Sequence, residues 1–362
     1  MTQKAFKDNP IVKAFIILGL LYLFLVSIKL MGTSFKQFKG TAEALVNSAN
    51  NPFIGLLIGI LATSIIQSSS TTTSMVVSLV GTGLLPFTVA VPMIMGANIG
   101  TSVTNTIVSL GNISREDEFK RAFYASTVHD FFNIIAVIIF FPLEMATGFL
   151  TSTATMMAEV FQSVGGGKST NYFKIIIKPT VGLIKSLVGG NAVGMLIISF
   201  ALLFTTLKYL SSNLKELFIG KFQNLFDRVV FRNAATSFVL GIFLTILVQS
   251  SSVTTSLVVP LAGAGLLNIQ QIVPYTLGAN IGTTVTAMLA SLATGSMAAI
   301  TVAFVHLLFN ILGSTLIYPF KRFPIYLSQK LSDFAVQNRL IPIAYILIMF
   351  FVVPVSLYFI FK

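Results

Sequence analysis

Two long stretches without acidic or basic residues set the strongest limit on how this chain can fold. No Asp, Glu, Lys or Arg occurs from Ala44 to Ser114 or from Asn233 to Phe320. Each stretch is several times longer than the roughly 20 residues that cross a bilayer. Only 9% of the chain is charged, whereas an ordinary soluble domain has about a quarter. The sequence therefore predicts a membrane protein with several spanning helices.

The positions of the charged residues argue against a nucleic-acid partner, although the formal net charge is +12. Lys and Arg cluster at the ends of apolar segments, as Lys29, Lys36 and Lys39 do. Basic residues at the depth of lipid headgroups are typical of membrane proteins, whereas nucleic-acid binding requires an exposed basic surface. The chain has no cysteine, which excludes disulfides, thiolate nucleophiles and cysteine metal sites.

An internal repeat divides the chain into two related halves. Residues 59–110 and 241–292 align without a gap, and 29 of the 52 positions are identical. Both copies contain Gln-Ser-Ser-Ser followed by Gly-Ala-Asn-Ile-Gly-Thr. We predict an N-terminal inverted repeat over residues 1–148 with its tetrad at 67–70, a polar central loop over 149–192, a C-terminal inverted repeat over 193–320 with its tetrad at 249–252, and a C-terminal segment with a final transmembrane helix over 321–362.

Each tetrad separates two short apolar segments, Pro52–Ile66 from Thr71–Leu85 and Phe238–Val248 from Val253–Leu267. At about 1.5 Å per residue, such helices cover only half to three-quarters of a ~30 Å hydrocarbon core. A re-entrant hairpin with the tetrad at its tip fits better, and an odd number of crossings per half inverts the second half. The expected fold is an all-α polytopic membrane protein with about nine crossings, built from two inverted-topology repeats with paired re-entrant helical hairpins.

Matching polar interruptions in inverted repeats indicate a transporter site near the bilayer midplane. A hairpin tip that precedes a helix offers free backbone N–H groups and a positive dipole end, which favour an anion. Neither uncharged stretch has a fixed cation, so we expect the anion to arrive with mobile cations. The candidate anion-binding residues are Gln67, Ser68, Ser69, Ser70, Asn98, Gln249, Ser250, Ser251, Ser252 and Asn280.

The other polar atoms near the tetrads are neutral hard oxygens, which suit an alkali cation better than a soft transition metal. Asp130 breaks the repeat because Leu307 stands at the matching position, and an acid within a membrane helix is a functional candidate. Asp130 either binds an additional cation, which makes transport electrogenic, or is protonated and inert. The candidate sodium ligands are Thr101, Thr104, Asp130, Asn133, Thr283, Thr286 and Asn310.

Two further features of the repeat can each be interpreted in two ways. The glycines and alanine of Gly-Ala-Asn-Ile-Gly-Thr are typical of close helix packing, while its Thr and Asn lie beside the tetrads and suit ligand roles. His129 and His306 are interpreted as histidines that bond neighbouring helices rather than as proton carriers, because both halves have one.

Together, the two tetrads, the run GANIGTSVTNTIV and the run FKRAFYASTVHDFFN resemble a bacterial member of the type II sodium–phosphate cotransporter family. The resemblance covers roughly Ala14 to Phe320. It implies sodium-coupled uptake of divalent phosphate between the two tetrads, and a multi-pass protein of the cell (inner) membrane with cytoplasmic termini. It also implies that Thr283 and Thr286 join Gln249 and Ser250 at a sodium site.

The resemblance further implies that an Asp at position 130 goes with electrogenic transport. The resulting hypothesis is a symporter that takes up inorganic phosphate with co-transported Na⁺ by alternating access, with scaffold helices that form a homodimer. Two alternatives stay open, a passive anion channel and an intramembrane hydrolase. A hydrolase would need His and an acid that converge on one nucleophile, whereas His129 and Asp130 are adjacent on one helix and no Gly-x-Ser-x-Gly occurs. The chain is therefore predicted not to be an enzyme.

Overall fold

The computed structural model describes residues 10–38, 51–226 and 233–361, and within these ranges the chain consists of helices joined by short turns, without a strand. Six described helices are long and apolar enough to cross a membrane. This confirms an all-α polytopic membrane protein, with fewer spanning candidates than the nine expected. The six candidates are Val12–Gln37, Phe87–Asn112, Glu116–Thr147, Ala192–Asn213, Met297–Phe320 and Leu340–Phe361.

A further long helix, α14 (Ile269–Thr294), carries the second Gly-Ala-Asn-Ile-Gly-Thr motif. It is not among the six, because its glycines, threonines and amides lower its hydropathy. The matching stretch of the first half is divided into α6 (Phe87–Thr101) and α7 (Val103–Ser109). In both halves, this polar helix is mostly buried inside the protein.

Two helical hairpins contain the tetrads. The first pairs α4 (Pro52–Ile66) with α5 (Ser69–Gly81), and the second pairs α12 (Ala234–Val248) with α13 (Ser251–Gly263). These helices of 13 to 15 residues agree with the short segments expected from the sequence. The re-entrant insertion of the hairpins and the inverted topology of the repeats stay predictions.

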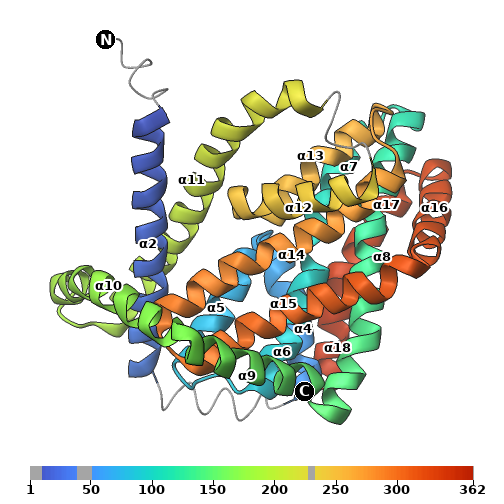
Figure 1. Ribbon diagram of the computed structural model, residues 1–362. Coiled ribbons are helices and arrows are strands. Elements are labelled where there is room, and N and C mark those ends of the chain that lie inside the picture. The colour runs from blue at the N-terminus through green and yellow to red at the C-terminus, as the bar shows by residue number, and fades with distance from the viewer. Residues whose placement is uncertain (1–9, 39–50, 227–232, 362) are drawn as a thin grey trace.

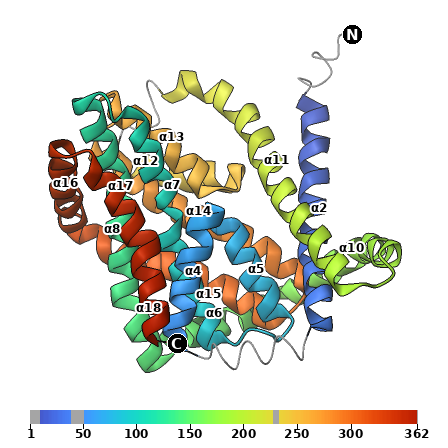
Figure 2. The same ribbon diagram turned by 180° about the vertical axis from the view of Figure 1, so that it is seen from behind.

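The first helices of the two halves, α2 (Pro10–Gln37) and α11 (Ala192–Phe226), pack against each other. They run antiparallel along one side of the molecule (Figures 1 and 2). The beginning of α2 and the end of the last helix lie at opposite ends of the molecule (Figure 1), and the cytoplasmic location of both termini stays a prediction. The homodimer and the four domain boundaries stay predictions.

The segment 149–192, predicted to be a polar loop, is largely helical. α9 (Phe149–Phe161) and α10 (Gly167–Leu187) meet at a kink within η2 (Gln162–Gly166). α9 lies across one end of the bundle, whereas α10 lies at its side, next to α2 (Figure 1). The prediction of a loop was wrong because apolar residues at helical spacing outweigh the glycines and lysines. Leu150, Ala154 and Ala158, four residues apart, are completely buried.

The C-terminal segment begins with an amphipathic helix. After α15 (Met297–Ile317) and η3 (Tyr318–Phe320), α16 (Arg322–Gln337) lies against α8 (Glu116–Thr147). Lys120 of α8 forms an ion pair of 2.9 Å with Asp333 of α16. The final membrane helix consists of α17 (Leu340–Leu347), η4 (Ile348–Val352) and α18 (Val353–Phe361). It therefore begins at Leu340, after an extended residue at Asn338.

Candidate functional site

Each tetrad forms the turn of its hairpin around a left-handed glutamine. Gln67 ends α4 and Gln249 ends α12, with φ values of 56° and 55°. They are the only residues other than glycine with positive φ in the described part of the chain. This conformation costs a side-chain-bearing residue roughly 1–2 kcal/mol. Because glycine would avoid this strain, we infer that the glutamine side chains have a role.

The second residue of each tetrad begins the next helix. The Oγ of Ser68 accepts a hydrogen bond from the backbone N of Thr71 at 3.3 Å, and Ser250 accepts one from Val253 at 3.3 Å. The remaining N–H groups of the first turn have no intrahelical partner. Each tip therefore presents a helix N-terminus, the arrangement that binds anions in many proteins.

The two tips contact each other although they lie about half the chain apart. The hydroxyl of Ser70 in the first tetrad donates to the backbone oxygen of Gln249 in the second, at 3.1 Å. The last two serines of each tetrad are buried, with at most 5% of the surface of each exposed. This bond brings the two tetrads into contact, with Ser69, Ser70, Ser251 and Ser252 buried at the tips.

The motif Gly-Ala-Asn-Ile-Gly-Thr packs against the first helix of its hairpin. A Cβ added at Gly100 would lie 2.6 Å from the backbone oxygen of Ile60, and one at Gly282 would lie 2.6 Å from that of Ile242. The two contacts are equivalent in the repeat, so the halves share the same backbone approach. The motif's glycines therefore serve close packing, which leaves its Asn and Thr residues for polar roles.

In the second half, two of the predicted sodium ligands are joined. The Thr286 hydroxyl donates to the Gln249 side-chain oxygen at 2.8 Å. Thr283 lies one turn earlier on α14 and is 2% exposed, and its hydroxyl has no hydrogen-bond partner in the described part of the chain. An unpaired buried hydroxyl and a side-chain amide oxygen are both chemically suited to a sodium ion.

The equivalent residues of the first half are arranged differently. Thr101 donates to the backbone oxygen of Ala97 at 2.8 Å, and the Thr104 hydroxyl is buried without a partner among the described residues. Gln67 is exposed. The two hairpin tips are therefore alike in backbone but different in side-chain contacts.

A chain of buried hydrogen bonds connects the halves beneath the tips. Thr255 of α13 donates to the Asn105 side-chain oxygen at 2.9 Å, and the Asn105 amide lies 3.2 Å from His129 Nδ1. His129 Nε2 lies 2.9 Å from the side-chain oxygen of Asn280. These contacts are mutually consistent when the imidazole proton is on Nε2. His129 thus bonds helices of both halves, as predicted.

The chain of hydrogen bonds continues through three asparagines. The Asn280 amide donates to the Asn133 side-chain oxygen at 2.9 Å, and the Asn133 amide donates to the backbone oxygen of Asn98 at 2.8 Å. All three residues are at most 3% exposed. All three are predicted site residues. The Asn280 and Asn133 side chains tie α14, α8 and α6 together, and among the described residues no hydrogen bond joins the three asparagines to the tetrads.

The second half lacks the matching bonds. His306 is completely buried, and neither of its ring nitrogens has a partner among the described residues. The amide nitrogen of Asn310 and the hydroxyl of Ser314, farther along α15, are also buried and unpaired within the described ranges. Because buried polar groups are normally hydrogen-bonded, this asymmetry needs a functional explanation.

Asp130 lies on α8 and is completely buried. Its Oδ2 accepts hydrogen bonds from Thr106 at 3.1 Å and from Tyr345 at 2.9 Å. Its Oδ1 is buried and has no partner among the described residues. Asp130 therefore offers one restrained oxygen and one available oxygen, which suits a cation ligand.

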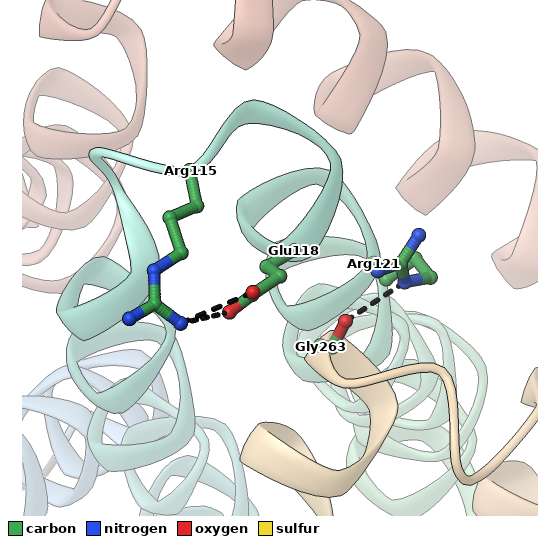
Figure 3. A network of polar contacts seen from close by, with 4 residues as sticks. All are labelled: Arg115, Glu118, Arg121 and Gly263. Atoms are coloured by element: carbon green, nitrogen blue, oxygen red, sulfur yellow. Dashed lines mark hydrogen bonds and ion pairs between the residues drawn. The ribbon is translucent and has the colours of Figure 1, made fainter.

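The base of the second hairpin is held by the first half. Nε of Arg121 in α8 donates to the backbone oxygen of Gly263 at 2.8 Å, as Figure 3 shows. A cation at the last turn of α13 is favoured by the free carbonyls and the helix dipole. The nearby pair Arg115–Glu118, 2.9 Å apart, lies at the surface. The Arg121 contact thus anchors the hairpin at the end away from its tetrad.

The structure adds polar residues that the sequence reasoning missed. Asn105 and Thr106 follow the first Gly-Ala-Asn-Ile-Gly-Thr motif but match Ala287 and Met288 in the second half, so the repeat did not select them. Tyr345 lies outside the repeats altogether. No group of three or more His, Cys, Asp or Glu residues able to hold a metal ion occurs within residues 10–38, 51–226 and 233–361.

Comparison with known proteins shows which family this chain resembles. The family model described as Na+/Pi-cotransporter matches residues 23–165 and 202–323. The sodium-dependent phosphate transport protein 2A of Ovis aries is 34% identical over 427 residues, which cover 95% of this chain and 67% of the relative. The sodium-dependent phosphate transport protein 2B of Homo sapiens is 32% identical over 443 residues, which cover 95% of this chain and 64% of the relative.

This chain thus spans about two thirds of the length of these relatives. No solved structure matches it. The matches confirm the resemblance inferred from the tetrads and assign the chain to transporters rather than to enzymes. The chain belongs to the Na+/Pi-cotransporter family.

Proposed function

We propose that this protein takes up inorganic phosphate together with sodium ions across the cell membrane. The observation that carries the proposal is the bond between Ser70 and the Gln249 backbone, which brings the two tetrads together. The proposed donors are the two helix N-termini and the serine hydroxyls of both tetrads, a set suited to a tetrahedral oxyanion. The names of the relatives, which are sodium-dependent phosphate transport proteins, support the same substrates.

The phosphate ligands in this proposal are the two tetrads, with Asn98 and Asn280 as supports beneath them. Neither hairpin contains a basic residue, and burying a dianion without compensation is very unfavourable. Sodium ions supply the compensation. The first sodium site comprises Gln249, Ser250, Thr283 and Thr286, and a second involves Asp130. Thr101, Thr104, Asn133 and Asn310 remain proposed ligands that act when the site is rearranged.

The direct test is uptake of radiolabelled phosphate into proteoliposomes under an inward gradient of Na⁺ or K⁺. We expect concentrative uptake with Na⁺ only, and a loss of at least about tenfold in both Ser69→Ala and Ser251→Ala, since each removes a hydrogen bond to a charged ligand. Ser186→Ala, at an exposed position on α10, is the matched control and should retain full uptake.

The same assay distinguishes the alternatives. A passive anion channel would equilibrate phosphate without sodium-dependent accumulation, and a hydrolase would depend on one serine only. With the membrane potential clamped and unclamped, Asp130→Gly is expected to lose the voltage dependence of uptake, because the proposed cycle moves one net charge through Asp130. Voltage-independent uptake by the wild type would reject electrogenic transport of divalent phosphate.

We further propose that the halves exchange their hydrogen bonds during alternating access. In this conformation His129 bonds Asn280, while His306, its repeat mate, is unpaired. α15, which carries His306, packs against α6, which carries Asn98. In the opposite-facing conformation, His306 would bond Asn98 and His129 would lose its partner. The two conformations then differ in which histidine is hydrogen-bonded to the asparagine of the other half.

Paired histidine variants test this exchange. His129→Leu should lower the stability of this conformation by about 2–3 kcal/mol, because Asn105 and Asn280 lose a partner. His306→Leu should leave the melting temperature unchanged or raise it, because it removes an unpaired polar group, and should still reduce uptake about tenfold or more. Thermal unfolding of purified protein and proteoliposome uptake are the two measurements. Full uptake by His306→Leu would rule the exchange out.

A further inference from the structure

Tyr345 lies on α17, in the final membrane helix, and contacts Asp130 from outside the two repeats. Its hydroxyl donates to Asp130 Oδ2 at 2.9 Å. Its ring packs edge-on against Phe123 and Phe350, with centroids 6.3 and 6.2 Å apart. The π-helical turn η4 follows three residues later, and such turns often occur at functional sites. The ring is therefore well placed to hold the hydroxyl still.

Asp130 depends on these contacts because its surroundings contain no compensating charge. No Lys or Arg in the described part of the chain forms an ion pair with it. The hydroxyls of Thr106 and Tyr345 both donate to Oδ2, and the Ser102 hydroxyl also lies close to the carboxylate, while Oδ1 has no hydrogen-bond partner among the described residues. Bonds to one oxygen restrict rotation of the carboxylate and keep the other oxygen available for a cation. Thr106 comes from the first repeat, whereas Tyr345 comes from a helix that the matched family segments do not include.

We propose that Tyr345 is a positioning residue, which orients the Asp130 carboxylate so that Oδ1 receives a sodium ion. The inference rests on the proposed role of Asp130 in sodium-coupled phosphate uptake. It makes the final helix part of the cation site rather than a lipid-facing support. Tyr345 does not bind the ion itself, so its effect passes entirely through Asp130.

The test is Tyr345→Phe, which retains the ring packing and removes only the hydroxyl. We expect the half-saturating sodium concentration for uptake to rise by about tenfold, the effect of losing one hydrogen bond to a charged group. The half-saturating phosphate concentration at saturating sodium should change less than about twofold. Replacing choline chloride with NaCl should raise the melting temperature of the purified wild-type protein. In Tyr345→Phe this rise should be smaller. Tyr326→Phe, at an exposed ring on α16, is the matched control.

A double-mutant cycle separates positioning from general stability. In an Asp130→Gly background, Tyr345→Phe should have no further effect on sodium dependence, because the group through which it acts is gone. An equal effect in both backgrounds, or an unchanged or lower half-saturating sodium concentration in Tyr345→Phe alone, would overturn the inference. If the wild type accumulates phosphate with sodium while Tyr345→Phe behaves identically, only the role of Tyr345 fails. If the wild type shows no sodium-dependent uptake, the proposed function fails with it.

Discussion

Gly96→Ala and Gly278→Ala are each expected to prevent this protein from reaching its native packing. A Cβ at Gly96 would overlap the backbone oxygen of Leu56, and one at Gly278 would overlap that of Phe238. The obstructing atoms are backbone, so the first hairpin helix must move away from its partner helix. Such overpacking costs about 3 kcal/mol or more, and the displacement also moves the tetrad at the end of the hairpin.

The measurement is the yield of monodisperse protein in detergent together with its melting temperature. Gly19→Ala is the matched control, because nothing lies within 4 Å of a Cβ added there. Alanine is also the better helix former, so this control should be neutral or slightly stabilising. Native yield and stability in both Gly96→Ala and Gly278→Ala would show that the helices do not approach as closely as described.

Gln249→Gly is expected to remain folded and to lose sodium-coupled uptake. Gly adopts the left-handed conformation of residue 249 without strain, which offsets its greater loss of backbone freedom on folding. We therefore expect stability within about 1 kcal/mol of the wild type. The substitution removes the oxygen that accepts the Thr286 hydroxyl. Loss of a residue that hydrogen-bonds to a metal ligand typically reduces metal affinity about 10–100-fold. Loss of a direct ligand should be at the upper end of this range, on the order of a hundredfold in apparent sodium affinity.

Gln67→Gly makes the same backbone change in the other tetrad. Gln67 is exposed and is proposed to bind phosphate. This variant should therefore raise the half-saturating concentration of phosphate more than that of sodium. The measurements are the melting temperature of each variant and its uptake as a function of sodium and of phosphate concentration, which show which ion each glutamine binds. If Gln249→Gly unfolds the protein, or leaves sodium dependence intact, Gln249 has a structural role instead of a ligand role.

Much of the architecture was predictable because it follows from local patterns. The uncharged stretches predicted membrane helices, and the short apolar segments beside each tetrad predicted α4, α5, α12 and α13, with ends that differ from the observed ones by up to four residues. The repeat matched the tetrads in sequence, and their glutamines have nearly identical backbone angles in the structure. Composition misled at 149–192, where glycines and lysines concealed the amphipathic helices α9 and α10.

The sequence by itself determined the membrane class, the duplicated tetrads and the family, since these depend on residue types and on spacing along the chain. Only the tertiary structure decided which polar atoms meet. The repeated sequence predicts equivalent contacts in the two halves, but His129 is hydrogen-bonded while His306 has no partner among the described residues. Gln249 likewise accepts a bond from Thr286, whereas Gln67 is exposed. Asp130 contacts Tyr345, which lies 215 positions farther along the chain. Such pairings depend on how distant helices pack, and in this conformation the two halves pack their polar side chains differently.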